Sequence, residues 1–78
     1  MEKKWITTEQ VLEALKNDPN NEHEYDLLIA GGSLMSTHLF YFDSEKNLFG
    51  HTTNCQYDWF SESELLEFYG GCHWVRFA

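Results

Sequence analysis

The chain has 78 residues, and its hydrophobic (42%) and charged (23%) fractions are typical of a globular domain. It carries 13 acidic residues against 5 Lys and Arg, for a formal charge of −8. Direct binding to nucleic acid is therefore not expected, because it needs a surplus of basic groups. No apolar run reaches the ~20 residues of a membrane span, and no secretory signal is visible at the N-terminus. We expect one domain, 1–78, located in the cytoplasm.

The first predicted element is a helix at about 8–17. Thr7 is its expected N-cap, and Gln10 stands three residues later, where the partner of a capping box belongs. Apolar residues follow at helical spacing. Asp18-Pro19 is expected to end the helix, because the residue before a proline is disfavoured in the helical region.

Three strands are predicted next, and a fourth ends the chain. Gly31-Gly32 is typical of a two-residue hairpin turn, and a polar turn follows the second strand, so the first three strands are expected to form an antiparallel meander. The expected strands are 25–30, 35–42, 48–53 and 72–77.

The second predicted helix begins as the first does. Ser61 is the expected N-cap, Glu64 its capping-box partner, and Gly70-Gly71 the end of the helix. The segment Trp5–Glu13 aligns in register with Trp59–Glu67. The two segments are either a duplicated binding element or one way of entering a helix used twice.

These elements predict an α+β domain in the order αβββαβ, with a four-stranded, mainly antiparallel sheet and two helices packed on one face. The core is expected to contain the apolar residues that the strand and helix periodicities place on inner faces. These are Ile6, Val11, Leu12, Leu15, Leu27, Ile29, Phe40, Phe42, Leu48, Leu65, Leu66, Phe68, Val75 and Phe77.

His and Cys residues gather late in the chain, and these residue types are candidates for metal binding or thiol chemistry. His51, Cys55, Cys72 and His73 lack the paired spacing of zinc ligands, and adjacent residues of a strand point to opposite faces. Cys55 could instead pair with His51 or His38 as a nucleophile, but the negative charge of the protein raises a thiol pKa. We expect two free thiols, no metal, no cofactor and no enzymatic activity. A Cys55–Cys72 disulfide and a small zinc- or thiol-dependent enzyme are the alternatives.

Aromatic residues indicate a contact surface. Alternation places Phe40 and Phe42 on one face of their strand and Tyr41 on the other, and it separates Trp74 from Val75. Because two helices cover one face of a sheet, Tyr41 and Trp74 are predicted to lie on the other face and to contact a partner. The alternatives are that both faces are covered or that Trp74 belongs to the core.

Acidic residues indicate the kind of partner. Asp58, Glu62, Glu64 and Glu67 follow one another with no basic residue between them, and an acidic face attracts basic proteins. We therefore predict a small protein-binding domain that inhibits a nucleic-acid-handling protein, by analogy of size and charge with phage anti-defence and toxin-immunity proteins. The alternatives are a solvated face that only keeps the protein soluble and an aromatic interaction or assembly module without nucleic-acid mimicry.

Overall fold

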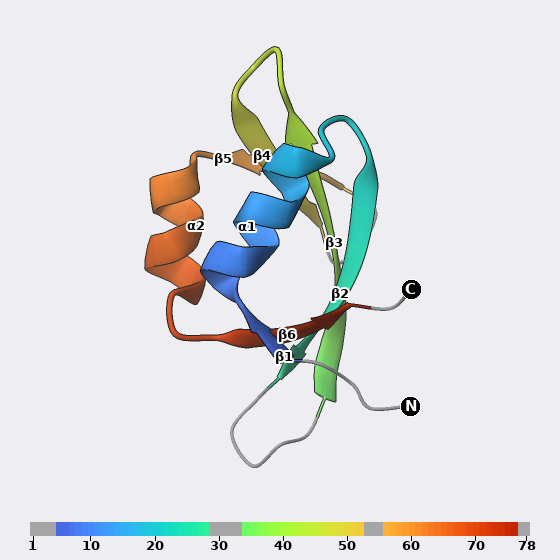
Figure 1. Cartoon of the computed structure of the whole chain (residues 1–78), viewed down its shortest axis with the longest axis vertical. Coiled ribbons are helices and arrows are strands. Elements are labelled where there is room, and N and C mark those ends of the chain that lie inside the picture. The colour runs from blue at the N-terminus through green and yellow to red at the C-terminus, as the bar shows by residue number, and fades with distance from the viewer. Residues whose placement is uncertain (1–4, 29–33, 53–55, 77–78) are drawn as a thin grey trace.

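The computed structural model of the chain describes residues 5–28, 34–52 and 56–76. Figure 1 shows the order of the elements in these ranges. They are β1 (Trp5–Thr7), α1 (Thr8–Asn17), β2 (Glu22–Leu28), β3 (Leu34–Asp43), β4 (Leu48–Thr52), β5 (Asp58–Phe60), α2 (Glu62–Tyr69) and β6 (His73–Arg76).

The strands form one sheet in the order β1-β6-β2-β3-β4-β5, and all neighbours are antiparallel. The predicted α+β class and the antiparallel sheet are confirmed, but the number of strands was wrong, because the sheet has six strands and not four. The two strands that the prediction missed, β1 and β5, are the sheet edges. Each has only three residues, which is too short to show alternation in a sequence.

Both helices begin where the capping boxes predicted. The Thr7 hydroxyl accepts from the backbone N–H of Gln10, and the Gln10 side chain accepts from the backbone N–H of Thr7 at 2.8 Å. Ser61 and Glu64 make the same pair of bonds at the start of α2. Beyond α2, Gly71 has a φ of 89°, a conformation that glycine adopts without steric cost.

The two repeated segments each fold as an edge strand that leads into a capped helix. The caps have nearly the same backbone angles, with φ −81° and ψ 165° at Thr7 and φ −75° and ψ 164° at Ser61. Trp5 and Trp59 lie in opposite edge strands, β1 and β5. The two repeated segments therefore enter their helices from the sheet edges in the same way.

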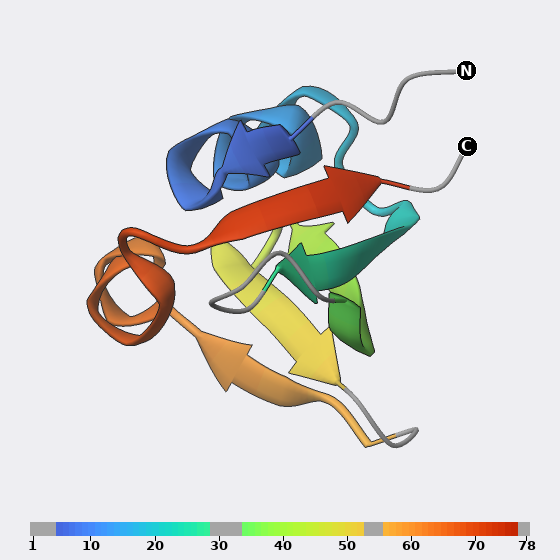
Figure 2. The ribbon, with the colours of Figure 1, turned by 90° about the horizontal axis from the view of Figure 1, so that it is seen from below.

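The helices lie on one face of the twisted sheet and contact each other (Figures 1 and 2). Thr8 in α1 joins the layers, because its hydroxyl donates to the carbonyl oxygen of Tyr69 in α2 at 2.6 Å and accepts from the indole N–H of Trp74 in β6 at 2.9 Å. All three groups are thus satisfied in the core, as buried polar groups need to be.

The core agrees with the prediction in part. The buried apolar residues are Val11, Leu12, Leu15, Tyr25, Phe40, Phe42, Phe49, Leu65, Trp74 and Val75. Tyr25, Phe49 and Trp74 had not been predicted there, and four predicted core residues are only half-buried, namely Ile6, Leu27, Leu48 and Leu66. Phe68 was wrongly assigned to the core, since its side chain lies on the outer side of α2. Ile29 and Phe77 lie outside the described residues, as does the predicted Gly31-Gly32 turn.

Strand β2 begins earlier than expected, at Glu22 instead of Tyr25. Its first residues are polar and resemble a loop in the sequence. His23 nevertheless points inward and is buried, with its Nε2 bonded to Asp18 at 2.7 Å and its Nδ1 bonded to the Tyr25 hydroxyl at 3.1 Å. These bonds offset the cost of burying an imidazole and allow a polar segment to continue the sheet.

Candidate functional site

An aromatic cluster lies on the sheet face away from the helices. Tyr41, Gly50 and Trp59 are directly opposite one another on β3, β4 and β5. Tyr57, just before β5, stacks on Trp59 with a centroid distance of 6.0 Å, and Tyr41 meets both rings edge-on at 6.3–6.4 Å. We call these three rings, with Gly50 beneath them, the aromatic platform.

Gly50 allows the rings to lie close to the backbone. A Cβ atom at this position would meet Tyr57 Cδ1 at 2.9 Å and the indole of Trp59 at 3.2 Å. The two rings therefore fill the space that a side chain would take. Trp59 still exposes 39% of its surface.

Charged groups border the platform. The ammonium group of Lys46, in the turn between β3 and β4, lies 4.5 Å from the centroid of the Trp59 ring, within the range of a cation–π interaction. The hydroxyl of Tyr57 donates a hydrogen bond to the carboxylate of Glu22, which lies opposite Tyr41 in the sheet. The platform thus combines exposed aromatic surface with a cation and a carboxylate.

Of the two predicted aromatic contact residues, only Tyr41 lies on this face. The prediction for Trp74 was wrong, because its side chain is fully buried among both helices and β3. Alternation had correctly separated Trp74 from Val75, but the inward side was assigned to Val75. Val75 is buried as well, since β6 is an interior strand and Val75 lies opposite Trp5 and Asp26.

Three residues of this surface were not predicted from the sequence, namely Tyr57, Trp59 and Lys46. Trp59 had been noticed only as part of the repeated helix entry. The available signal was the alternation in Tyr57-Asp58-Trp59-Phe60, which places Tyr57 and Trp59 on one side and Phe60 on the other.

The four predicted acidic residues have different surroundings. Glu62 forms an ion pair with Lys16 of α1 at 2.9 Å, and Glu64 is the capping-box partner of Ser61. Asp58 and Glu67 are exposed and make no hydrogen bond or ion pair within the described residues. Asp58 lies opposite His51 in the sheet, and its charge raises the pKa of that imidazole, so Glu67 is the one of the four with no interaction within the described residues that explains it.

Phe68 lies beside these carboxylates on the outer side of α2. It exposes 59% of its surface and contacts Phe60 edge-on at 5.7 Å. Asp58 and Phe60 project from the same side of β5, because they are two residues apart. We call this set the α2 surface, and it consists of Asp58, Phe60, Glu64, Glu67 and Phe68.

Negative charge dominates the described part of the chain. Its basic residues are Lys16, Lys46 and Arg76, since Lys3 and Lys4 lie outside the described ranges. Lys16 is paired with Glu62, and Lys46 lies 4.0 Å from Asp43. Several carboxylates in these ranges have neither a hydrogen bond nor an ion pair, namely Glu9, Glu13, Glu24, Glu45, Asp58 and Glu67.

A histidine pair lies between the sheet and α2. His38 Nδ1 and His51 Nε2 are 2.6 Å apart, and the two rings stack with a centroid distance of 4.8 Å. Burial, together with the charge of His51, lowers the pKa of His38 from 6.5 to about 4. Burial also lowers the pKa of His51, while Asp58 opposes this shift. One imidazole must donate to the other, so the pair is suited to the neutral state.

The discounted metal and thiol candidates do not come together in the described residues. No group of three His, Cys, Asp or Glu side chains in these ranges could hold a metal ion. His51 is bonded to His38, Cys72 carries a free thiol, and Cys55 lies outside the described residues.

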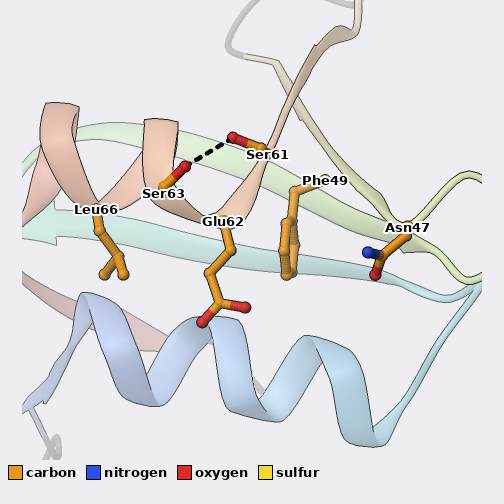
Figure 3. Close-up of a pocket in the computed structure, with 6 residues that line it drawn as sticks. All are labelled: Asn47, Phe49, Ser61, Glu62, Ser63 and Leu66. Atoms are coloured by element: carbon orange, nitrogen blue, oxygen red, sulfur yellow. Dashed lines mark hydrogen bonds between the residues drawn. The ribbon is translucent and has the colours of Figure 1, made fainter.

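A shallow pocket of about 450 Å³ opens beside the start of α2. Figure 3 shows Glu62 and Leu66 pointing from α2 toward α1, with Phe49 between them and Asn47. The hydroxyls of Ser61 and Ser63 at its rim are bonded to each other at 3.1 Å. Its polar groups from α2 are therefore already engaged within the chain.

Neither of the two helices in the described ranges has the length and apolar character that crossing a membrane requires. No protein-family model matches the chain, and the comparisons with curated proteins and with solved structures found no match. The functional proposal therefore rests on the chemistry of the described residues.

Proposed function

We propose that this chain is a small acidic protein-binding domain that inhibits a basic, nucleic-acid-handling protein by covering its nucleic-acid-binding groove. The α2 surface is the proposed contact. The observation that carries the proposal is that Phe68, the most exposed of the large apolar side chains described, lies on the same surface as Asp58 and Glu67, which form no hydrogen bond or ion pair within the described residues.

Phe68 supplies an apolar anchor for an interface, which charged residues alone do not provide. An exposed aromatic residue that becomes buried in a pocket is a typical anchor of a protein interface, and the polar residues around it form the rim. On α2, Glu64 is four residues before Phe68 and three before Glu67, the spacings that bring residues of a helix side by side, so Glu64 lies beside both. A partner with an apolar pocket bordered by Lys or Arg would complement this surface.

The unpaired carboxylates supply the charge preference. Each of these carboxylates can approach a Lys or Arg of the partner that otherwise contacts a phosphate. Long-range attraction between the opposite charges raises the association rate with such a partner. Repulsion among like charges costs stability, and no hydrogen bond or ion pair within the described residues offsets it at Asp58 or Glu67.

The test is a capture experiment in which the wild-type protein and two charge-reversed variants are used as bait. Asp58→Lys with Glu67→Lys alters the α2 surface, whereas Glu9→Lys with Glu13→Lys makes the same charge change on exposed positions of α1. We avoid Glu62, because reversing it would place two cations together at Lys16.

We expect wild type and the α1 variant to capture a protein that binds DNA or RNA, and excess nucleic acid to release it. The α2 variant should capture much less of this protein. Association of the wild-type chain with the captured protein should slow steeply as the salt concentration rises. Equal capture by all three baits, or a captured protein that still binds nucleic acid in the complex, would refute the proposal.

A second candidate function is an aromatic interaction module, in which charge only keeps the protein soluble. The aromatic platform favours it, because Trp59 is exposed while Gly50 and the neighbouring rings fix its position. Binding that is insensitive to salt and to the charge reversals, but is lost in Trp59→Ala, would support this alternative.

A further inference from the structure

We infer that the aromatic platform binds an arginine side chain of the basic partner, with the guanidinium stacked on Trp59 in place of the Lys46 ammonium. This inference rests on the proposed function and adds a second contact, on the sheet face opposite the helices. It is independent of the α2 surface in its residues.

The Trp59 indole is held in position for such a contact. Its ring lies over Gly50, stacks with Tyr57 and meets Tyr41 edge-on. These contacts fix the ring before binding, so less conformational entropy is lost when a ligand stacks on it.

Lys46 shows which chemistry the ring attracts. Its ammonium group lies 4.5 Å from the ring centroid, while its distance to Asp43 is 4.0 Å, the limit of an ion pair. The side chain of Lys46 is more than half exposed, so this contact is held loosely. An arginine of the partner can displace the Lys46 ammonium from the ring and bind it more favourably, because a planar guanidinium stacks on an aromatic face and loses its hydration more easily than an ammonium.

The charge around the platform favours a cation over the other ligands of aromatic surfaces. The carboxylate of Glu22 lies at the Tyr57 side, and Glu24 is the next residue of β2 on the same face. An ionised carboxylate has several acceptor sites, so Glu22 can accept from a guanidinium while it keeps the hydroxyl of Tyr57. Nucleic-acid bases would bring phosphates toward these carboxylates, and a proline-rich peptide would gain nothing from them.

The experiment compares three peptides of equal length, namely a Gly-Arg repeat, a Gly-Lys repeat and an uncharged proline-rich peptide. Their dissociation constants are measured by calorimetry, and the indole N–H signals of the Trp residues are followed by NMR. We expect the arginine peptide to bind about two- to fivefold tighter than the lysine peptide and to shift the Trp59 signal.

Matched variants isolate the platform. Trp59→Ala should abolish the preference for arginine, whereas Trp5→Ala should keep it, because Trp5 is similarly exposed (41%) but lies at the opposite edge of the sheet. Lys46→Gln should strengthen binding of the arginine peptide more than Lys16→Gln does, although both variants change the net charge equally.

The outcomes separate this inference from the function on which it rests. If both basic peptides bind equally well to wild type and to Trp59→Ala, the platform does not read arginine, and the acidic-surface proposal stands. If neither basic peptide binds, both proposals fail. Tighter binding of the proline-rich peptide, or equal losses in the two Trp variants, would overturn the arginine inference alone.

Discussion

The histidine pair predicts a loss of stability in mild acid. An unfolded histidine takes up a proton as the pH falls through about 6.5, whereas His38 in the folded protein does so only at about 4. The unfolded state therefore binds more protons between these values, and stability falls with pH across this window. Above about pH 6.5 the contribution of His38 to stability is fully present.

The size of this loss of stability follows from the difference between the folded and unfolded pKa values of His38. One pKa unit corresponds to about 1.4 kcal/mol, so His38 alone should cost the folded state about 2 kcal/mol between pH 7 and about pH 4.5. A domain of this size has a total stability on the order of 4–12 kcal/mol, so the loss is large. The pKa of about 4 for His38 already contains the opposing effect of the Asp26 carboxylate, whose charge raises this pKa.

The assay is urea unfolding followed by far-UV circular dichroism at both pH values. His38→Phe keeps an aromatic ring among Phe40, Tyr69 and Trp74 and removes the titrating group. The variant should lose about 2 kcal/mol less than wild type over the same pH range, whatever its stability at pH 7.

The control is His73→Gln, because His73 has an exposed side chain. This variant should lose as much stability as wild type in acid. If wild type and His38→Phe instead show the same loss, the acid sensitivity comes from the carboxylates, and the argument from the buried pair is wrong.

Three further predictions concern the fold and its chemistry. Thr8→Val should lower the free energy of unfolding by about 1–3 kcal/mol, because it leaves the buried indole N–H of Trp74 without its acceptor, while the carbonyl of Tyr69 keeps the N–H of Cys72. Thr8→Ser, which keeps the hydroxyl, should lose much less in the same urea titration. Ser61→Ala should cost about 1 kcal/mol, and an unchanged melting temperature would show that the cap contributes nothing. A chelator should leave the thermal melting curve unchanged, and unfolding on chelation would reveal a bound metal.

The sequence predicted best those features that depend on neighbouring residues. The caps at Thr7 and Ser61 were found because their hydrogen bonds join residues only three positions apart. The edge strands were missed because an edge is defined by its partner, and β1 pairs with a strand at the far end of the chain. The inward side of β6 was likewise assigned wrongly, since the position of Trp74 depends on Thr8 and both helices.

In the candidate sites, too, the features that depend on neighbouring residues were predicted and those that depend on distant residues were not. Tyr41 was placed correctly because strand alternation is local, but its neighbours Tyr57 and Trp59 come from another part of the chain. The acidic run was visible, yet only the structure distinguishes Glu62 and Glu64, which have partners, from Glu67, which has none within the described residues. A charge count cannot make that distinction.

The position of β6 has a consequence for how the protein forms during synthesis. β6 is the last of the described strands in chain order, but it lies inside the sheet, between β1 and β2. Strands β2 to β5 can pair as soon as they leave the ribosome, whereas β1 pairs only with β6 among the described strands. Until residues 73–76 emerge, the nascent chain presents the unpaired edge of β2, an open template for wrong strand pairing. Completion of the sheet therefore waits for β6, and the pairing of segments far apart in the chain makes this step slow.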